Sequence, residues 1–171
     1  MNRVLIEYRG WAEIDPWIIS ASQGKYRSID ELRRKEPNGA FPFSENCGTR
    51  LAIASWMSRE VTEGADILFF VYDPCMIPDE DMERIFGALR SDDGQKYPID
   101  DYPAQIHHNS SQKVLLPFMA AALFLRWGFL VYDPVKDQIL DFSEDNYVDV
   151  VTQNSEFLSY IISAKEKKEY L

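Results

Sequence analysis

The stretch from Ile67 to Tyr72 constrains the fold of this chain more than any other feature. Its sequence, ILFFVY, is continuously apolar and rich in aromatic and β-branched residues, and Asp73-Pro74 follows it as a turn signal. A short run of this composition predicts a strand that is buried on both faces. We therefore expect a central sheet with helices packed against it.

Length and composition indicate one domain. The chain has 171 residues, of which 46% are hydrophobic and 13% aromatic, enough for one good core. Some segments repeat their apolar residues with the period of a helix, and others read as strands. The predicted fold class is α+β (mixed α/β), with a central β-sheet packed by several helices in a single globular domain over residues 1–171.

Five segments carry helical signals. Ser28 and Glu31 can form a capping box, in which each side chain accepts a hydrogen bond from the backbone of the other. Gly64 is placed to end a second helix, and Ser110-Ser111 can cap another that contains Pro117. The predicted helices cover residues 28 to about 35, 49–62, 79–89, 111 to about 127, and 155–168.

The other segments predict strands and loops. An opening strand runs from Arg3 to Tyr8, and Asp15-Pro16 marks a turn after it. Phe129–Tyr132 and Gln138–Phe142 predict a hairpin. Residues 37–46 and 91–110 are interrupted by prolines, so both are predicted loops, the second a long exposed connection of the kind that often carries function.

The charge of the chain is concentrated in two segments. Residues 79–101 hold eight carboxylates and three cations, and residues 133–149 hold six carboxylates and one cation. Each segment has a net charge of −5, which accounts for the whole formal charge of −10. Such potentials favour encounter with a cationic partner and disfavour nucleic acid and anionic membranes. The alternative is that these are solvated surface segments.

A repeated tetrapeptide connects the two acidic segments. Val71-Tyr72-Asp73-Pro74 recurs as Val131-Tyr132-Asp133-Pro134, and an acidic segment follows each copy. Coincidence explains the match better than duplication does, because strands often end in Asp-Pro and no further similarity extends around the match. If the two strands are parallel neighbours, both acidic segments leave the sheet at the same end and form one surface.

The residue types that carry chemistry are sparse. His107 and His108 are adjacent, so on a strand they point to opposite faces and could not share one metal ion. Cys47 and Cys75 form no CxxC pattern, which is typical of reduced thiols. The chain has no glycine loop of the kind that cradles phosphate. No cofactor, metal or catalytic residue is predicted.

Neither membrane insertion nor export is expected. The longest apolar run, Val114 to Leu125, has 12 residues, whereas a membrane-spanning helix needs about 20. The apolar run that follows Met1 is too short for a secretory signal and reads better as a strand. The expected location is the cytoplasm.

The segment Tyr8-Arg9-Gly10-Trp11-Ala12-Glu13-Ile14, followed by Asn38-Gly39, resembles the opening of bacterial immunity proteins from polymorphic toxin and contact-dependent inhibition systems. The resemblance implies a small acidic protein that binds and neutralises a cognate basic toxin domain. Many such toxins are nucleases, whose clefts are cationic because they hold phosphates. The expected partner-binding residues are acids and interleaved tyrosines: Asp79, Glu80, Asp81, Asp92, Asp93, Tyr97, Asp100, Asp101, Tyr102, Asp137, Glu144, Asp145 and Tyr147.

Two other functions fit the same composition. Clustered carboxylates could hold a divalent cation in a metal-assisted hydrolase. An acidic face could also dock this chain as an adaptor subunit of a larger assembly. For the toxin-neutralising function, the expected partner is a protein, and neither nucleic acid nor a membrane is expected to bind.

Overall fold

The computed structural model describes residues 6–74, 88, 90–92, 95–96 and 99–167. The helices in this part are α1 (Trp11–Ala21), α2 (Ile29–Arg33), α3 (Cys47–Met57), α5 (Gln112–Phe124) and α6 (Ser155–Lys167). The strands are β1 (Ile6–Arg9), β2 (Gly39–Pro42), β3 (Ile67–Asp73), β4 (Ser91–Asp92), β5 (Gln95–Lys96), β6 (Ala104–His107), β7 (Gly128–Asp133), β8 (Gln138–Ser143) and β9 (Tyr147–Val151).

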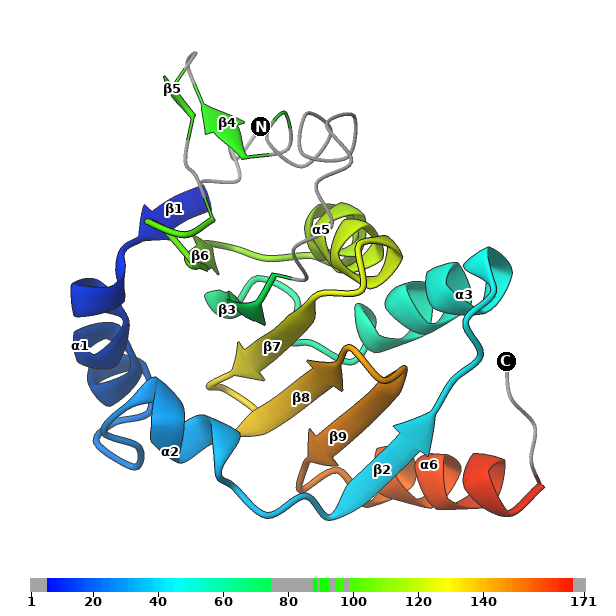
Figure 1. Cartoon of the computed structure of the whole chain (residues 1–171). Coiled ribbons are helices and arrows are strands. Elements are labelled where there is room, and N and C mark those ends of the chain that lie inside the picture. The colour runs from blue at the N-terminus through cyan, green and yellow to red at the C-terminus, as the bar shows by residue number, and fades with distance from the viewer. Residues whose placement is uncertain (1–5, 75–87, 89, 93–94, 97–98, 168–171) are drawn as a thin grey trace.

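Seven strands form one sheet in the order β1-β6-β3-β7-β8-β9-β2 (Figure 1). Every neighbouring pair in it is antiparallel. The short strands β4 and β5 form a separate antiparallel pair. With helices alongside this sheet, the chain has the predicted α+β fold.

One face of the sheet is covered by three helices and holds the larger core. Helices α3, α5 and α6 contribute side chains such as Ile53, Phe118 and Phe157, which pack with Phe69 and Phe129 of the central strands. In β9 and β2, buried and half-exposed residues alternate, as expected when an antiparallel sheet packs one face and leaves the other to solvent. Half of the sheet therefore has an open face.

On the opposite face, the described helices cover β6, β3, β7 and the first part of β8. Ile14 and Ile18 of α1 and Leu32 of α2 pack there on residues such as Phe70 and Leu130. Figure 1 shows α1 and α2 beside one half of the sheet, with α6 alongside β2 at the other. We call the part that the described helices leave uncovered, formed by residues of β8, β9 and β2, the open face: Ala40, Pro42, Asp141, Ser143, Tyr147 and Asp149.

The register defines two ends of the sheet. Asp73 of β3 lies opposite Gly128, the first residue of β7, and β8 ends and β9 begins at this level, where Ser143 pairs with Tyr147. β1 also ends there and β6 begins there. We call this the Asp73 end. The opposite end, where β3 starts at Ile67, is the Ile67 end.

Most strongly patterned segments fold as predicted. β3 is central and its first five residues are buried, β7 and β8 form the predicted hairpin, and α5 contains Pro117. The Ser28 hydroxyl accepts a hydrogen bond from the Glu31 amide at 3.2 Å, but the Glu31 carboxylate accepts from the amide of Arg27, not of Ser28. α3 starts at Cys47 and ends at Met57, short of the predicted residue 62.

The predicted turn at Asp15-Pro16 is wrong, because both residues lie inside α1. The Gly10 amide donates to the Glu13 carboxylate at 3.0 Å, which caps the start of this helix. Ile14 and Ile18 are one helical turn apart and both are buried. This burial stabilises the helix, and it outweighs the helix-breaking tendency of Pro16.

Two predicted loops contain strands. β2 lies within residues 37–46, and its Pro42 is tolerated because β2 is the last strand of the sheet. β6 lies within the connection predicted as exposed, yet all four of its residues are buried between β1 and β3. β9 was not predicted as a strand. The predicted helix over 79–89 lies outside the described residues, apart from Ala88.

The two copies of Val-Tyr-Asp-Pro end strands that are neighbours but antiparallel. Leu68 pairs with Tyr132, and Asp73 pairs with Gly128. Asp73 and Asp133 therefore lie at opposite ends of the sheet. The condition that would have brought both acidic segments to one end is not met, and the second segment runs from the Ile67 end at Asp133 to the Asp73 end at Glu144.

Candidate functional site

The predicted partner-binding residues divide into three sets. Asp79, Glu80, Asp81, Asp93 and Tyr97 lie outside the described residues, and of Asp92 only the backbone, in β4, is described. Asp100, Asp101, Tyr102, Glu144, Asp145 and Tyr147 lie at the Asp73 end. Asp137 lies at the opposite end, in the turn between β7 and β8.

Five exposed carboxylates lie at the Asp73 end of the sheet. Asp100 and Asp101 precede β6, Asp73 ends β3, and Glu144 and Asp145 form the turn between β8 and β9. Within the described part of the chain, none of them forms an ion pair. We call these five residues the acidic end. The Asp100 carbonyl also accepts a hydrogen bond from the Trp11 indole at 3.1 Å, which fixes the backbone of this segment.

Strand spacing sets the width of the acidic end. Strands lie about 4.8 Å apart, so β6 and β8 are separated by about 14 Å. This distance is about two Debye lengths at physiological ionic strength. Asp73, on the strand between them, shortens each gap. A partner that spans these four strands would therefore meet exposed carboxylates at three of them, β6, β3 and β8.

Of the cations described near the acidic end, the buried Arg90 donates to the carbonyl oxygen of Tyr102, and the others are engaged elsewhere. Arg126 pairs with Glu45 at 2.7 Å, and the buried Arg50 donates to the side-chain oxygen of Asn146 at 2.9 Å. Asn146 adopts a positive φ of 58° in the turn between β8 and β9, where the Ser143 hydroxyl accepts from the amide of Asp145. The turn that presents Glu144 and Asp145 is thus held by its own hydrogen bonds.

Two acids of the second segment serve the fold. Asp133 is buried, and its carboxylate accepts hydrogen bonds from the amides of Thr62, Val135 and Lys136, the first at 2.7 Å. Asp137 pairs with Lys25 across the turn. Asp137 is therefore separated from the acidic end by the length of the sheet, and it has a structural role in joining the α1–α2 connection to the β7–β8 turn.

The open face carries a pair of carboxylates that face each other across two strands. Asp141 of β8 lies directly opposite Asp149 of β9, and Asp149 lies opposite Ala40 of β2. Like charges at directly opposed positions destabilise an antiparallel sheet. Both aspartates are half-buried, and among the described residues neither forms an ion pair.

Tyr72 binds one of these two carboxylates. Its hydroxyl lies 2.7 Å from Asp141 Oδ1 and 3.0 Å from the carbonyl oxygen of Phe142. The ring crosses β7 at Gly128, where a Cβ would lie 2.6 Å from Tyr72 Cε2. The Arg33 guanidinium lies over the same ring, 3.8 Å from its centre. The absence of a side chain at Gly128 thus lets Tyr72 reach the open face.

The acid–base properties follow from this geometry. Burial raises the pKa of Asp141, and the Asp149 carboxylate raises it further against the opposing effects of Tyr72 and Arg33. Burial also raises the pKa of Asp149. Burial and the Asp141 carboxylate raise the pKa of Tyr72 far above its ordinary value, so the phenol remains a neutral donor. Asp149 has no such donor among the described residues.

Asp141 and Asp149 were not among the predicted binding residues. Alternation over Tyr147–Val151 is the signal that could have identified Asp149, because Val148 and Val150 are buried and Asp149 lies on the other face. The register that places Asp149 opposite Asp141 depends on the turn at 143–146, which composition does not determine.

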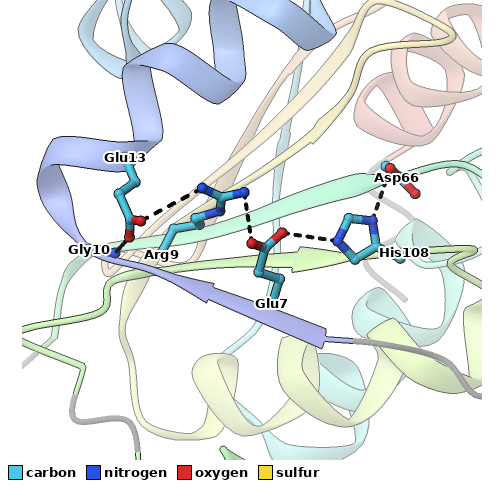
Figure 2. A network of polar contacts seen from close by, with 6 residues as sticks. All are labelled: Glu7, Arg9, Gly10, Glu13, Asp66 and His108. Carbon is cyan, nitrogen blue, oxygen red and sulfur yellow. Dashed lines mark hydrogen bonds and ion pairs between the residues drawn. The ribbon is translucent and has the colours of Figure 1, made fainter.

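A second polar network joins β1 to the Ile67 end (Figure 2). His108 lies between two carboxylates, with Nε2 3.2 Å from Glu7 and Nδ1 3.0 Å from Asp66. Glu7 also pairs with Arg9, which approaches Glu13 of α1. Burial alone would lower the pKa of His108, but the hydrogen bonds to Asp66 and Glu7 outweigh it and raise that pKa.

In this network, which we call the clasp, the His108 ring bridges the carboxylates of Glu7 and Asp66. The clasp lacks the geometry of a metal site. The imidazole separates the two carboxylates, so an ion bound to one ring nitrogen would meet only one of them. Its neighbour His107 is fully buried, donates to Gln105 at 3.0 Å and packs against Phe118, and burial lowers its pKa to about 3. His107 is therefore a neutral core residue.

The described residues contain no group of three His, Cys, Asp or Glu side chains placed to hold a metal ion. Cys47 is exposed and unpaired by a disulfide. None of the described helices combines the length and hydropathy that crossing a bilayer requires.

Fold and site together define an acidic α+β protein with a seven-stranded antiparallel sheet, open over part of one face. Comparisons with family models, with curated proteins and with solved structures find no match to this chain.

Proposed function

We propose that this protein is an antitoxin-like inhibitor, which binds a basic toxin domain through its acidic surface and performs no catalysis of its own. The observation that supports this proposal best is the acidic end, with five exposed carboxylates at one end of the sheet. None has a cation partner among the described residues, so their potential is available to a partner.

A nuclease domain is the partner that fits this surface best. Its cleft must hold phosphates, so it presents Lys and Arg side chains. Carboxylates from the acidic end would form charge-assisted hydrogen bonds with these cations, and the summed field would accelerate encounter. Tyr147 and Tyr102 are half-buried at the same end and would supply the partly apolar contacts from which affinity comes. The proposed location is the cytoplasm.

Co-expression tests this function. The domain encoded by the reading frame next to this chain is expressed alone and together with it, and growth of the host is measured. The proposal expects the domain alone to stop growth and the wild-type chain to restore it. Failure of the chain to restore growth in the presence of a toxic basic neighbour would overturn the proposal.

A matched pair of variants tests the surface. The end variant carries Asp101→Asn, Glu144→Gln and Asp145→Asn. The control variant carries Glu36→Gln, Glu63→Gln and Glu156→Gln, three exposed acids near the Ile67 end. Both variants have the same net charge. The proposal expects the end variant to lose protection and the control variant to keep it. Equal protection by both variants would contradict a role for the acidic end.

A further inference from the structure

The open face carries two opposed carboxylates that are separate from the acidic end. Its Asp141 and Asp149 side chains project from the middle of two paired strands, where repulsion between them works against the fold. The neighbouring positions on the covered face are Leu140, Val148 and Val150, which are all buried. Residues that destabilise a fold and make no compensating structural contact are candidates for function.

The two carboxylates are unequal, and this asymmetry indicates what could lie between them. Asp141 accepts a hydrogen bond from Tyr72, which leaves its second oxygen, Oδ2, available. Asp149 accepts no hydrogen bond in the described structure. Two carboxylates whose Cβ atoms are about 5 Å apart, as at directly opposed positions of a strand pair, suit one planar donor that can bond to both.

An arginine of this chain, Arg33, already lies close to Asp141. The Arg33 guanidinium lies over the Tyr72 ring and acts electrostatically on Asp141. Arg33 is exposed and comes from α2, on the covered side of Tyr72. On the other side, Asp149 and the half-exposed Tyr147 have no described cation. The face is therefore complementary to an additional positive charge beyond Arg33.

We propose that the open face is the docking surface for a basic protein and that one arginine of this partner lies between the carboxylates of Asp141 and Asp149. Arginine fits better than lysine because its planar fork can donate to two acceptors and stack on an aromatic ring such as Tyr147. It fits better than a small divalent cation because Mg²⁺ and Ca²⁺ require six or more oxygen ligands. The bound cation removes the repulsion between the two carboxylates.

This inference rests on the proposed function for its choice of a protein partner. It adds a location, because it extends the contact from the acidic end onto the open face. Glu144 and Asp145 end the same hairpin that carries Asp141 and Asp149, so one partner could contact both regions. The two regions can be tested separately, since their substitutions do not overlap.

The experiment uses the full chain and a peptide probe, acetyl-Gly-Arg-Gly-amide, at physiological salt. NMR follows the side-chain carboxyl signals of Asp141 and Asp149 and the ring signals of Tyr72 and Tyr147. We expect saturable shifts at these residues with a dissociation constant of about 1 mM, the scale of a few good polar contacts. The citrulline peptide, a neutral isostere, should bind at least tenfold more weakly, and the lysine peptide more weakly than arginine.

Two variants separate the open face from charge alone. Asp149→Asn should weaken the arginine peptide about tenfold, because one charge-assisted hydrogen bond is lost. The matched control, Glu63→Gln, removes the same charge from an exposed position near the Ile67 end and should change binding less than twofold. Equal weakening by both variants, equal binding of arginine and citrulline peptides, or shifts confined to the acidic end would overturn the proposal.

Failure of this inference differs from failure of the proposed function. If the chain neutralises its toxin and Asp141→Asn with Asp149→Asn leaves that binding unchanged, the function stands and the open face is not the docking surface. If the peptide binds at Asp149 but the chain protects against no toxin, the arginine site stands and the inhibitor function is wrong. Thermal melting of the double variant confirms that it is folded in either case.

Discussion

Replacing Asp149 by asparagine should stabilise the protein at neutral pH. Asp149 lies opposite Asp141 in the antiparallel pair of β8 and β9, and substitution to asparagine removes a like charge while it keeps the shape of the side chain. Directly opposed residues have Cβ atoms about 5 Å apart. Two unit charges at about 5 Å repel by about 0.8 kcal/mol in water and by about 3 kcal/mol at an effective dielectric constant of 20.

Cross-strand pairs in sheets usually contribute about 0.2–1 kcal/mol, so we expect a gain near the upper part of that range, about 0.5–1 kcal/mol. A gain of about 1 kcal/mol corresponds to a rise of about 2–4 °C in Tm for a chain of this size. Raising the salt concentration should reduce the gain, because both side chains are partly exposed to solvent.

The stability gained in Asp149→Asn should depend on pH. The folded-state pKa of Asp149 is raised, so the folded protein binds this proton more tightly than the unfolded chain does. The wild-type protein therefore loses stability from this group as pH rises from about 4 through the folded-state pKa. The gain in Asp149→Asn should be absent in acid, appear over that window and then stay constant.

Urea unfolding at several pH values measures this gain, with Asp145→Asn as the control. Asp145 is exposed in the turn, so its substitution should change the free energy of unfolding by less than about 0.5 kcal/mol. An unchanged or lowered stability of Asp149→Asn at neutral pH, with an unchanged m-value, would refute the reasoning that the two carboxylates repel.

Three further outcomes test other parts of the structure. For His108→Asn, we expect the decline in wild-type stability as pH rises above about 6.5 to disappear in pH-dependent urea unfolding, because protonated His108 joins Glu7 and Asp66; an identical decline in the variant would contradict the clasp. Gly128→Ala should destabilise the protein by about 1–3 kcal/mol in thermal melts and perturb the Tyr72 ring signals, since the new Cβ overlaps that ring; unchanged ring signals would argue against the crossing. The end variant used in the growth assay should unfold at the wild-type urea midpoint, and a large loss of stability would show that those carboxylates are structural.

The elements that sequence predicted best are those whose own residues determine their burial. β3 is apolar throughout, and α5 and α6 have continuous helical patterns, so little else was needed to place them. α1 was not predicted because Asp15-Pro16 was interpreted as a turn, although Ile14 and Ile18 have the spacing of one helical turn and are both buried. Local composition and tertiary packing disagreed there, and packing determined the structure.

β2 and β6 could not be predicted from their own residues. Each has only four residues and is stabilised by neighbours distant in sequence, β9 for β2 and both β1 and β3 for β6. β6 also contains Gln105 and His107, which are polar yet fully buried. Alternation is too short in such segments to distinguish a strand from a loop.

The positions of the proposed binding residues could be predicted from sequence only in part. Exposed acids in turns, such as Asp101 and Glu144, can be recognised from composition, and the structure places both at the Asp73 end. The placement of Asp137 and the pairing of Asp141 with Asp149 depend on strand direction and register. Those are set by turns and by long-range packing, which the sequence pattern did not specify.

The rate of association between this chain and the toxin domain that we propose it neutralises, measured against salt concentration by stopped flow, tests the central claim most directly. The account predicts that the wild-type rate falls steeply with salt and that the end variant associates about tenfold more slowly at low salt, within the range known for electrostatic steering. The control variant, with the same net charge, should stay close to the wild type. Identical rates and salt slopes for all three proteins would contradict a docking surface at the acidic end of the sheet.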